Sequence, residues 1–306
     1  MSIISVIMPV YNCQRFIADS IESILGQTLK DFEFVIVNDG STDNTEDIIK
    51  SYLTDSRIRY YKFQCHQGYA QTCNKAVELA QCEFIAMQDS DDVSFSSRLE
   101  EESEVLINNP DVEMVYSPVL FINIAGEIIG RWGGTGCQFS KDETFYKLYI
   151  EGDFIPNPTV MMRRRHITNN KLYNSELSFC CDYEHKLRLL HDYPVIEINH
   201  PLVKMRRDMR HETMTSNRQE NFLAERKILK IAYDRYRNNH LRVHRLDYRK
   251  ALSNQMLKES HYYAQKRNIG KSLVLLFKAC GLYPVHRHDY IRILLEIAAK
   301  KKNINC

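Results

Sequence analysis

Residues 5–12 read SVIMPVYN, a short apolar and β-branched run that predicts a strand ending at Tyr11 and Asn12. Apolar residues at helical spacing follow this run, and the same strand-then-helix alternation is then repeated along the chain. The expected elements are strands at 5–10, 32–37, 58–63 and 83–87, and helices at 16–25, 42–53 and 69–80. Strands that alternate with helices of this length indicate an α/β fold with a mostly parallel sheet covered by helices on both faces.

Polar residues follow three of these strands at the point where each strand ends. They are Tyr11-Asn12, the segment NDGSTD at 38–43 and the segment QDSDD at 88–92. Ligands of such sheets bind outside the carboxyl ends of the strands, so these residues are candidates for a site. No GxGxxG or GxxxxGK[ST] turn follows the first strand, where the chain reads YNCQRF, and this disfavours a dinucleotide or P-loop site.

The segment at 88–92 places Asp89, Asp91 and Asp92 within four positions. Their charges repel unless a cation or hydrogen-bond donors compensate them, and Mg²⁺ and Mn²⁺ favour carboxylate oxygens together with substrate phosphates. A purely structural alternative is that Asp91 or Asp92 caps the helix expected from about Ser97. The position at the mouth of the fourth strand favours a metal and diphosphate site.

The segment DGSTD at 39–43 allows a structural and a functional interpretation. Asp39 and Gly40 suit a turn, and Ser41 or Thr42 suits the cap of the following helix. Alternatively, the carboxylate is presented to a nucleobase or ribose, with the ring of Tyr11 available on the neighbouring strand to stack on a base.

Taken together, SVIMPVYN, VNDGSTDNT at 37–45 and QDSDD, in this order and spacing, resemble the signatures of family 2 glycosyltransferases with the GT-A fold. The resemblance covers about residues 5–215. It implies a Rossmann-like GT-A sheet, a nucleotide-diphospho-sugar donor, most often a UDP-sugar, and a Mn²⁺ or Mg²⁺ ion held by the DxD carboxylates. Such an ion would neutralise the charge that develops on the leaving diphosphate.

Residue by residue, the resemblance implies that Pro9 and Tyr11 line the base pocket and that Asp39 accepts a hydrogen bond from the base. It also implies that Asp89 contacts the ribose or the donor sugar and that Asp91 ligates the metal.

The same resemblance implies that Asp182, in SFCCDYE at 178–184, is the catalytic base, with Glu184 in reserve. Cys181 stands where the family commonly has Glu, and Asp182 could instead simply cap a helix. Further on, RHETMT at 210–215 resembles a motif after the last sheet strand, which makes His211 a candidate metal ligand or diphosphate donor. The alternative is an ordinary surface histidine.

Composition and charge limit the classes of protein to which the chain could belong. The chain has 306 residues, of which 44% are hydrophobic, so it is too apolar to be disordered. Residues 1–203 carry 17 basic and 30 acidic side chains, whereas residues 204–306 carry 24 and 9, giving net charges of −13 and +15. No apolar run suits a membrane-spanning helix, and no basic stretch of a secretory signal precedes the first strand. Nine scattered cysteines without a CxxC pair predict reduced thiols in a cytoplasmic protein.

The chain is expected to divide at residue 215. Residues 1–215 would form the catalytic domain, with a nucleotide-sugar half at about 1–110 and an acceptor half at about 111–215, and residues 216–306 a helical basic C-terminal region. The remaining expected elements are helices at 97–108 and 182–190, strands at 112–124, 158–162, 195–198 and 202–205, a hairpin near 126–129 and a flexible loop at 132–136. The cluster RRRH at 163–166 suits either a pyrophosphate contact or a solvated turn.

The basic region from residue 222 to residue 297 has apolar positions at helical spacing. An amphipathic element on an anionic membrane surface, a nucleic-acid surface with interleaved Tyr and Arg, and simple packing on the acidic domain all fit this pattern. Membrane contact is favoured, and no nucleic acid is expected, because similar polymer-building glycosyltransferases act on lipid-linked acceptors.

These expectations combine into an inverting glycosyltransferase on the inner face of the cell membrane. It would move a hexose or N-acetylhexosamine from a UDP-sugar to a hydroxyl of a surface-glycan acceptor, with a lipid-linked glycan of O-antigen, capsule or lipooligosaccharide type among the candidates. The alternatives are a metal-dependent nucleotidyltransferase or phosphatase, and a non-catalytic binding module for membrane or nucleic acid.

Overall fold

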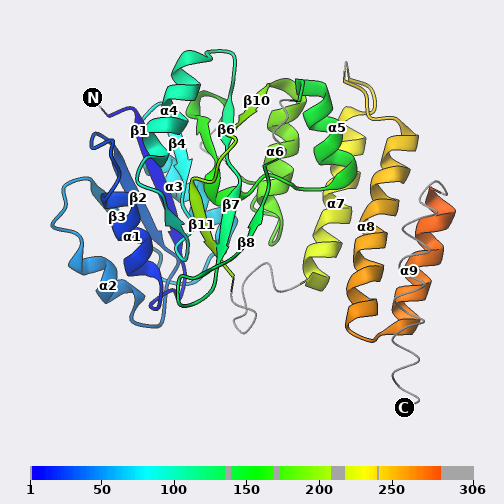
Figure 1. Cartoon of the computed structure of the whole chain (residues 1–306), viewed down its shortest axis with the longest axis horizontal. Coiled ribbons are helices and arrows are strands. Elements are labelled where there is room, and N and C mark those ends of the chain that lie inside the picture. The colour runs from blue at the N-terminus through cyan, green and yellow to red at the C-terminus, as the bar shows by residue number, and fades with distance from the viewer. Residues whose placement is uncertain (1, 135–138, 168–171, 208–217, 240, 284–306) are drawn as a thin grey trace. The chain divides into compact units, whose positions relative to one another are not determined.

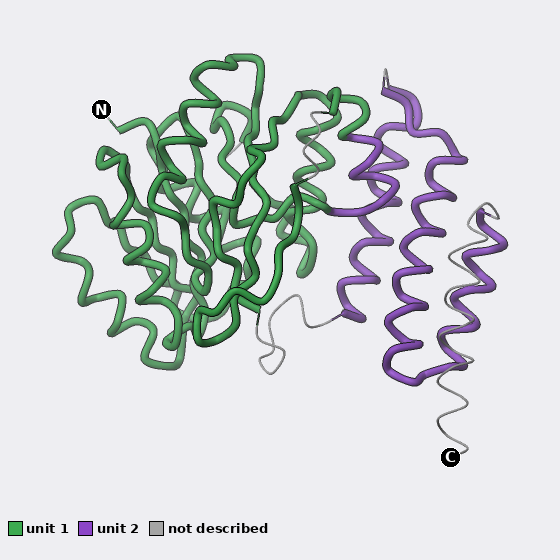
Figure 2. The backbone as a smooth tube through the Cα atoms, in the orientation of Figure 1, with its two compact units in different colours: residues 1–144, 154–216 green, residues 145–153, 217–306 purple. Residues whose placement is uncertain are grey.

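A computed structural model describes residues 2–134, 139–167, 172–207, 218–239 and 241–283. The chain forms two compact units (Figure 2). The first comprises residues 1–144 and 154–216, and the second comprises residues 145–153 and 217–306.

The first unit is built on a seven-stranded sheet in the order β10-β6-β9-β4-β1-β2-β3 (Figure 1). β4, β1, β2 and β3 pair in parallel, as do β10 and β6, while β9 runs antiparallel to both of its neighbours. The expectation of a mostly parallel sheet with flanking helices is therefore confirmed. The strands are β1 (Ile4–Val10), β2 (Glu33–Asn38), β3 (Ile58–Lys62), β4 (Phe84–Met87), β6 (Met114–Tyr116), β9 (Met161–Arg163) and β10 (Val195–Glu197).

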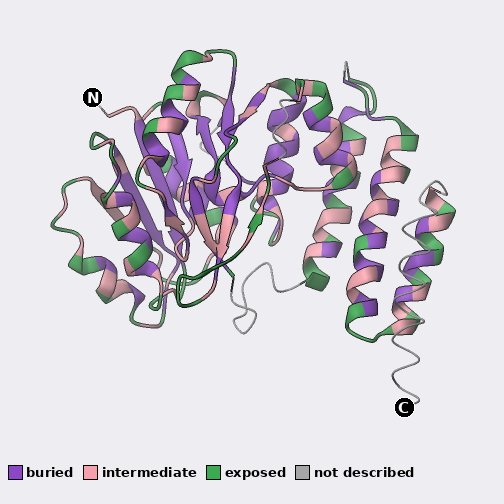
Figure 3. Cartoon of the chain, in the orientation of Figure 1, coloured by how far each residue is buried: buried purple, intermediate pink, exposed green. Residues whose placement is uncertain are grey.

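Both faces of this sheet are buried, as Figure 3 shows for its central strands. Side chains of successive strand residues point to opposite faces, so Val6 and Met8 join one core with the apolar positions of α1 and α4. The intervening residue Ile7 is also buried, on the face where α3 packs on β1 and β2. The helices of this unit are α1 (Ile17–Leu25), α2 (Thr45–Ser51), α3 (Tyr69–Leu79), α4 (Arg98–Asn108) and α6 (Cys181–Asp192), together with the start of α5 (Lys141–Glu151).

A second, four-stranded sheet has the order β5-β11-β7-β8. Its strands are β5 (Val93–Ser94), β7 (Val119–Ile122), β8 (Ile128–Trp132) and β11 (Val203–Arg206). The single strand expected at 112–124 is wrong, because the chain leaves the large sheet after β6 and enters the small sheet at β7. The break falls at Ser117-Pro118, where proline lacks the N–H that a continuous ladder needs, while the N–H of Ser117 is satisfied by the Thr159 hydroxyl.

Other boundaries differ from the sequence-based expectation for local reasons. α2 begins at Thr45 rather than at residue 42, because the hydroxyl of Ser41 and the N–H of Thr42 bond to Asn12 of the neighbouring loop. Two short 3₁₀ helices, η1 (Asn157–Thr159) and η2 (Arg164–His166), flank β9, so the strand expected at 158–162 is displaced and shortened. Trp132 belongs to β8 rather than to a loop.

The second unit is helical, as expected for the basic region. Its described helices are α7 (Arg218–Tyr236), α8 (Arg245–Gln265) and α9 (Ile269–Leu282). Residues 145–153 of the expected catalytic domain also belong to it, because the ring of Phe145 packs edge-on against Tyr236 and the Tyr149 hydroxyl donates to the carbonyl of Leu229.

None of the described helices is long and apolar enough to cross a membrane. The seven cysteines in the described part of the chain are all free thiols, which agrees with the expectation of reduced cysteines.

Candidate active site

The acidic loop, residues 88–92, begins directly after β4 at the carboxyl edge of the large sheet. The Oδ1 atom of Asp89 accepts a hydrogen bond of 3.0 Å from the Tyr69 hydroxyl on α3. Burial raises the pKa of Asp89 to about 7, and the neighbouring charge of Asp91 acts in the same direction. A carboxyl group with this pKa is partly protonated at neutral pH. A cation or a hydrogen-bond donor nearby would favour its charged form.

The other two carboxylates of the loop have different surroundings. Asp92 is buried, and its Oδ1 accepts the backbone N–H of Arg206 at 2.7 Å. Asp91 is only half-buried, and no side chain of the described residues donates a hydrogen bond to its carboxylate. Burial raises the pKa of both groups. Because Asp92 is buried and bonded to Arg206, the carboxylate of Asp91 is the more open of the two to an incoming cation.

Arg206, at the end of β11, secures the loop from the small sheet. Its Nε donates to the Asp91 carbonyl at 3.0 Å, and its Nη2 contacts a carboxylate oxygen of Asp19 at 3.1 Å. The guanidinium also lies over the ring of Phe16, 4.4 Å from its centroid. The Arg206 charge lies close to Asp91 and Asp92 without forming a side-chain hydrogen bond to the Asp91 carboxylate.

The side chain of Gln88 bonds to the backbone of the acidic loop. Its amide nitrogen lies 3.0 Å from the Asp89 carbonyl and 2.9 Å from the Asp92 carbonyl. Its carbonyl oxygen accepts from the Ser94 hydroxyl and from Nη1 of Arg98. The loop is therefore fixed at both ends by one buried amide.

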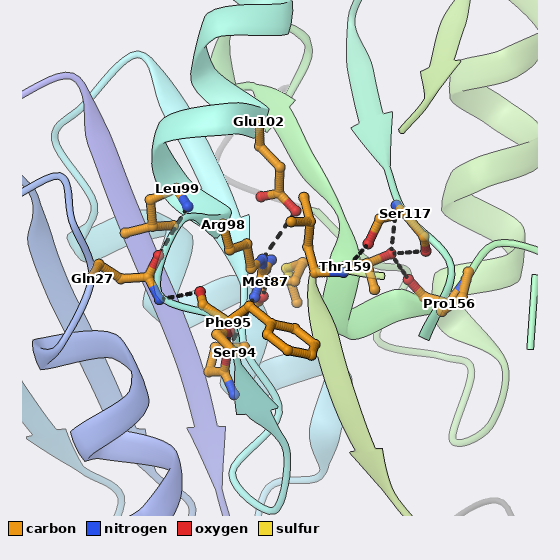
Figure 4. Close-up of polar contacts among 12 residues, drawn as sticks. Gln27, Met87, Ser94, Phe95, Arg98, Leu99, Glu102, Ser117, Pro156 and Thr159 are labelled. Carbon is orange, nitrogen blue, oxygen red and sulfur yellow. Dashed lines mark hydrogen bonds and ion pairs between the residues drawn. The ribbon is translucent and has the colours of Figure 1, made fainter. Parts of the chain in front are cut away.

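Arg98, which is fully buried, completes this support (Figure 4). It donates to the Met87 carbonyl at 2.7 Å and to Glu102 at 3.0 Å, one turn further along α4. Burial raises the pKa of Glu102 to about 7 despite the nearby guanidinium, and the second oxygen of that carboxyl has no hydrogen-bond partner in the described part of the chain. Gln27 makes a similar buried set of bonds next to it, to Phe95 and Leu99.

A chain of hydrogen bonds connects Asp89 to the segment that precedes α6. The Tyr69 hydroxyl accepts from the amide of Asn157 at 2.9 Å, and the Asn157 carbonyl oxygen accepts from the Tyr173 hydroxyl at 3.1 Å. The backbone N–H and carbonyl of Tyr173 both bond to the side-chain amide of Asn74 on α3. These contacts join β4, α3, η1 and the segment leading to α6 around one carboxylate.

Asp182 lies in the first turn of α6, within electrostatic reach of Asp89. Its Oδ2 is 2.9 Å from Nζ of Lys186, one turn along the helix. Burial opposes ionisation, but the Lys186 ammonium and the backbone N–H groups of Asp182 and Tyr183 together hold the pKa of Asp182 below its usual range. The structure thus brings together Asp89 and Asp182, which are far apart in the sequence.

Glu184, the reserve candidate, has a less accessible position. Its side chain is 5% exposed against 26% for Asp182, and it pairs with Arg188 at 3.4 Å. The comparison favours Asp182 as the residue that an acceptor can reach.

The loops after β1 and β2 contain Tyr11 and Asp39, for which the resemblance implies contact with a nucleotide base. The Asp39 carboxylate accepts the backbone N–H groups of Gln67 at 2.7 Å and Gly68 at 2.9 Å, and Nδ1 of His66 lies 2.8 Å from it. The half-exposed ring of Tyr11 lies 4.1 Å from the His66 ring, centroid to centroid. Tyr11 and Asp39 therefore lie close together, both in contact with His66, as expected from the sequence.

Two backbone features lie in or beside these loops. Gly40 has a φ of +69°, and a Cβ there would lie 2.8 Å from the Cys65 backbone, so only glycine suits this turn. Pro9 is buried in β1, where its missing N–H is tolerated because pairing with β4 ends at Ile7. Its contact with a base stays a prediction.

The donor set fits a Mn²⁺ or Mg²⁺ ion that is bound together with substrate. No group of three or more His, Cys, Asp or Glu side chains able to hold a metal lies among the described residues. Mg²⁺-type ions are often bound by one or two carboxylates and complete their shell with phosphate oxygens and water, which agrees with a single open carboxylate at Asp91. His211, the other expected ligand, lies outside the described residues.

Several residues of the site were missed by sequence reasoning. They are His66, Tyr69, Lys186 and Arg206. Lys186 had a detectable signal, since it follows Asp182 at the i,i+4 spacing of helical ion pairs. The others depend on contacts between segments far apart in the chain.

The RRRH cluster has a structural role at the opposite edge of the sheet. β9 is antiparallel to β4, so it ends beside the start of β4 rather than beside the acidic loop. There Arg163 is buried and donates to the Leu106 carbonyl and to Glu83, and Arg165 pairs with Glu113. A pyrophosphate contact by these side chains is therefore not supported.

Comparisons of sequence place this arrangement in a family. The sequence model described as "Glycosyl transferase family 2" matches residues 5–175. An uncharacterised glycosyltransferase of Methanocaldococcus jannaschii is 32% identical over 208 residues, covering 67% of this chain and 70% of the relative. The O-antigen biosynthesis glycosyltransferase WbnJ of Escherichia coli is 32% identical over 202 residues, covering 64% and 75%.

Solved structures share the fold at low sequence identity. S. aureus TarS, residues 1–349, in complex with UDP-GlcNAc, superposes with a TM-score of 0.62 at 17% identity and covers 92% of this chain and 91% of that one. The mannosyltransferase PcManGT from Pyrobaculum calidifontis, in complex with GDP-Man and Mn²⁺, gives a TM-score of 0.55 at 17% identity, with coverages of 98% and 86%.

Proposed function

Because this chain belongs to glycosyl transferase family 2, we propose that it is an inverting, metal-dependent hexosyltransferase that uses a nucleotide-diphospho-sugar, preferentially a UDP-sugar. The transferred group would be a hexose or N-acetylhexosamine, and the acceptor a hydroxyl of a surface glycan. The observation that carries the proposal is that Asp89, in the acidic loop next to Asp91, also lies within electrostatic reach of Asp182 on α6. O-antigen synthesis by WbnJ and UDP-GlcNAc binding by TarS support the substrate classes.

Asp182 would act as the general base. The acceptor O–H bond breaks as its proton passes to the Asp182 carboxylate, and the oxygen bonds to the anomeric carbon from the face opposite the diphosphate. The bond between that carbon and the diphosphate oxygen breaks, and its electron pair leaves with the diphosphate. One displacement of this kind inverts the anomeric centre.

Asp89 and Asp91 would serve the donor. Asp91 is the residue that would hold a Mn²⁺ or Mg²⁺ ion, and such an ion supplies positive charge to the departing diphosphate. Asp89, kept in place by Tyr69, would receive hydroxyl groups of the ribose or donor sugar. A nucleotidyltransferase or phosphatase would share the acidic loop, but family membership favours sugar transfer.

The helical unit would place the enzyme peripherally on the cytoplasmic face of the cell membrane, next to a lipid-linked acceptor. Support comes from the net charge of +15 after residue 203 and from four exposed apolar side chains: Leu223, Leu246, Val274 and Phe277. The alternative of nucleic-acid stacking is less favoured, because Tyr233 and Tyr248 stack on each other at 4.8 Å.

A panel of UDP- and GDP-sugars tests the proposal. Release of the nucleoside diphosphate would be measured with and without Mn²⁺ for the wild type and for Asp182→Asn. We expect Mn²⁺-dependent release from at least one UDP-sugar, and inversion at the anomeric carbon of the sugar product. Metal-dependent release of inorganic phosphate without release of sugar would contradict the proposal and indicate a phosphatase.

A further inference from the structure

Lys186 is a cation buried in the middle of α6. Its side chain is 2% exposed, and its Nζ lies 2.8 Å from the Ile155 carbonyl and 2.9 Å from Asp182 Oδ2. A buried ammonium is costly unless it is paired, so this lysine is held in one position by the two oxygens. Through Lys186, the Asp182 carboxylate is therefore connected to the Ile155 carbonyl in the segment before η1.

A second ion pair on α6, between Glu184 and Arg188, differs from the pair of Asp182 and Lys186. Arg188 and Glu184 have the same i,i+4 spacing, yet Glu184 is more deeply buried than Asp182. Arg188 also contacts the Leu172 carbonyl and the His185 ring, away from the acidic loop. Of the two pairs, the one with Lys186 includes the carboxylate that faces the candidate site.

Among the described residues, the other titratable groups that act on Asp182 do not supply positive charge. Asp89 faces it from the acidic loop, Tyr173 from the segment before α6, Cys73 from α3 and Cys181 from α6 itself. Burial raises the pKa of Tyr173 and of both cysteines well above their usual values, so these groups are neutral. Burial of Asp182 favours its protonation, and Lys186 opposes it.

We propose that Lys186 is the positioning residue of the general base: it orients the Asp182 carboxylate and keeps it charged and ready to accept the acceptor's proton. This inference rests on the proposed function of Asp182. The backbone N–H groups of Asp182 and Tyr183 act on the same carboxylate but carry no net charge. Without Lys186, the burial of Asp182 would raise the pKa of its carboxyl, and more of the base would be protonated at the acid end of the working pH range.

The test is the pH dependence of kcat/KM for Mn²⁺-dependent release of UDP from the active UDP-sugar. Lys186→Met removes the ammonium, Lys186→Gln keeps a donor without the charge, and Lys186→Arg keeps the charge. An opposite charge at this distance typically lowers an aspartate pKa by about 1–3 units. We therefore expect the acid limb to move up by about one pH unit or more in the Met and Gln variants and to stay near its original position in the Arg variant. UDP affinity should change by less than about threefold.

Arg188→Met is the matched control, because it breaks the neighbouring buried pair and loses stability without touching Asp182. Its acid limb should coincide with that of the wild type. An unmoved limb in Lys186→Gln, or an equal movement in Arg188→Met, would overturn the positioning role while leaving the transferase intact. An inactive wild type would overturn the proposed function and this inference with it. If Lys186→Met does not fold, the Gln and Arg variants still decide the outcome.

Discussion

Replacing Gln88 by methionine should loosen the acidic loop without removing any of its carboxylates. Gln88 is fully buried, and its amide nitrogen lies within hydrogen-bond distance of the Ser20 hydroxyl and the carbonyls of Asp89 and Asp92. Its oxygen accepts from Ser94 and Arg98. Methionine has a similar length but offers none of these bonds, so buried polar groups would lose their partners.

The loss of stability follows from these contacts. The three contacts of the amide nitrogen share its two hydrogens, so about four hydrogen bonds are lost in all. A buried hydrogen bond contributes about 1 kcal/mol net, so the free energy of unfolding should fall by about 3–5 kcal/mol. Because the freed carbonyls belong to Asp89 and Asp92, the loop backbone should also become mobile. We expect the Mn²⁺ concentration for half-maximal UDP release to rise by at least about tenfold, since Asp91 would no longer be held in place.

Gln27→Met provides the matched control. Gln27 is equally buried and bonds to Ser23, Phe95 and Leu99, but not to the acidic loop. Urea unfolding followed by circular dichroism should show a loss of about 2–4 kcal/mol for this variant, with an unchanged Mn²⁺ requirement. The reasoning is refuted if Gln88→Met loses less than about 1 kcal/mol, or if both variants shift the Mn²⁺ requirement equally.

Three further predictions follow from other parts of the chain. Asp182→Asn should bind UDP normally in calorimetry while transferring sugar at least about a hundredfold more slowly, and a parallel loss of UDP affinity would instead indicate a structural role. Glu102 has a pKa of about 7 when folded against an ordinary value of 4.5, so its contribution to stability is largest at low pH and is lost as the pH rises through 7. Between pH 5 and 7, the unfolding free energy of the wild type should therefore fall relative to Glu102→Gln by up to about 1.4 kcal/mol per pH unit, and parallel pH curves would contradict this. The full-length protein should sediment with anionic but not neutral liposomes and be released by salt, since each basic side chain near such a surface contributes about 1 kcal/mol; binding to neither would leave the helical unit with a packing role only.

The central part of the fold was predictable because its signals are local. β1, β2 and β4 are short apolar runs between helical periodicities, and their order alone implies a parallel sheet. The break between β6 and β7 had one signal in the sequence, Pro118, which the expected strand at 112–124 ignored. The two-residue β5 and the support of the break by Thr159 were not predictable, because they depend on pairing with β11 and on a hydroxyl far along the chain. Such contacts leave no periodic trace in the sequence.

The candidate site shows the same division. The sequence could place three of the site residues, Asp39, Asp89 and Asp91. Each lies in a loop that directly follows a strand, at the carboxyl edge of the sheet. Arg206 and Tyr69 could not be placed, since they reach the acidic loop from β11 and α3, and only the folded chain brings these elements there. The role of Asp182 came from resemblance, and its proximity to Asp89 required the structure.

Calorimetric titration of UDP with and without Mn²⁺, into the wild type and into Asp91→Ala, tests most directly whether the acidic loop is a metal-dependent donor site. No side chain of the described residues donates a hydrogen bond to the Asp91 carboxylate, so its removal should spare the fold. The account predicts that Mn²⁺ strengthens UDP binding by at least about tenfold in the wild type and by less than about twofold in Asp91→Ala. An equal gain from Mn²⁺ in both proteins would contradict it.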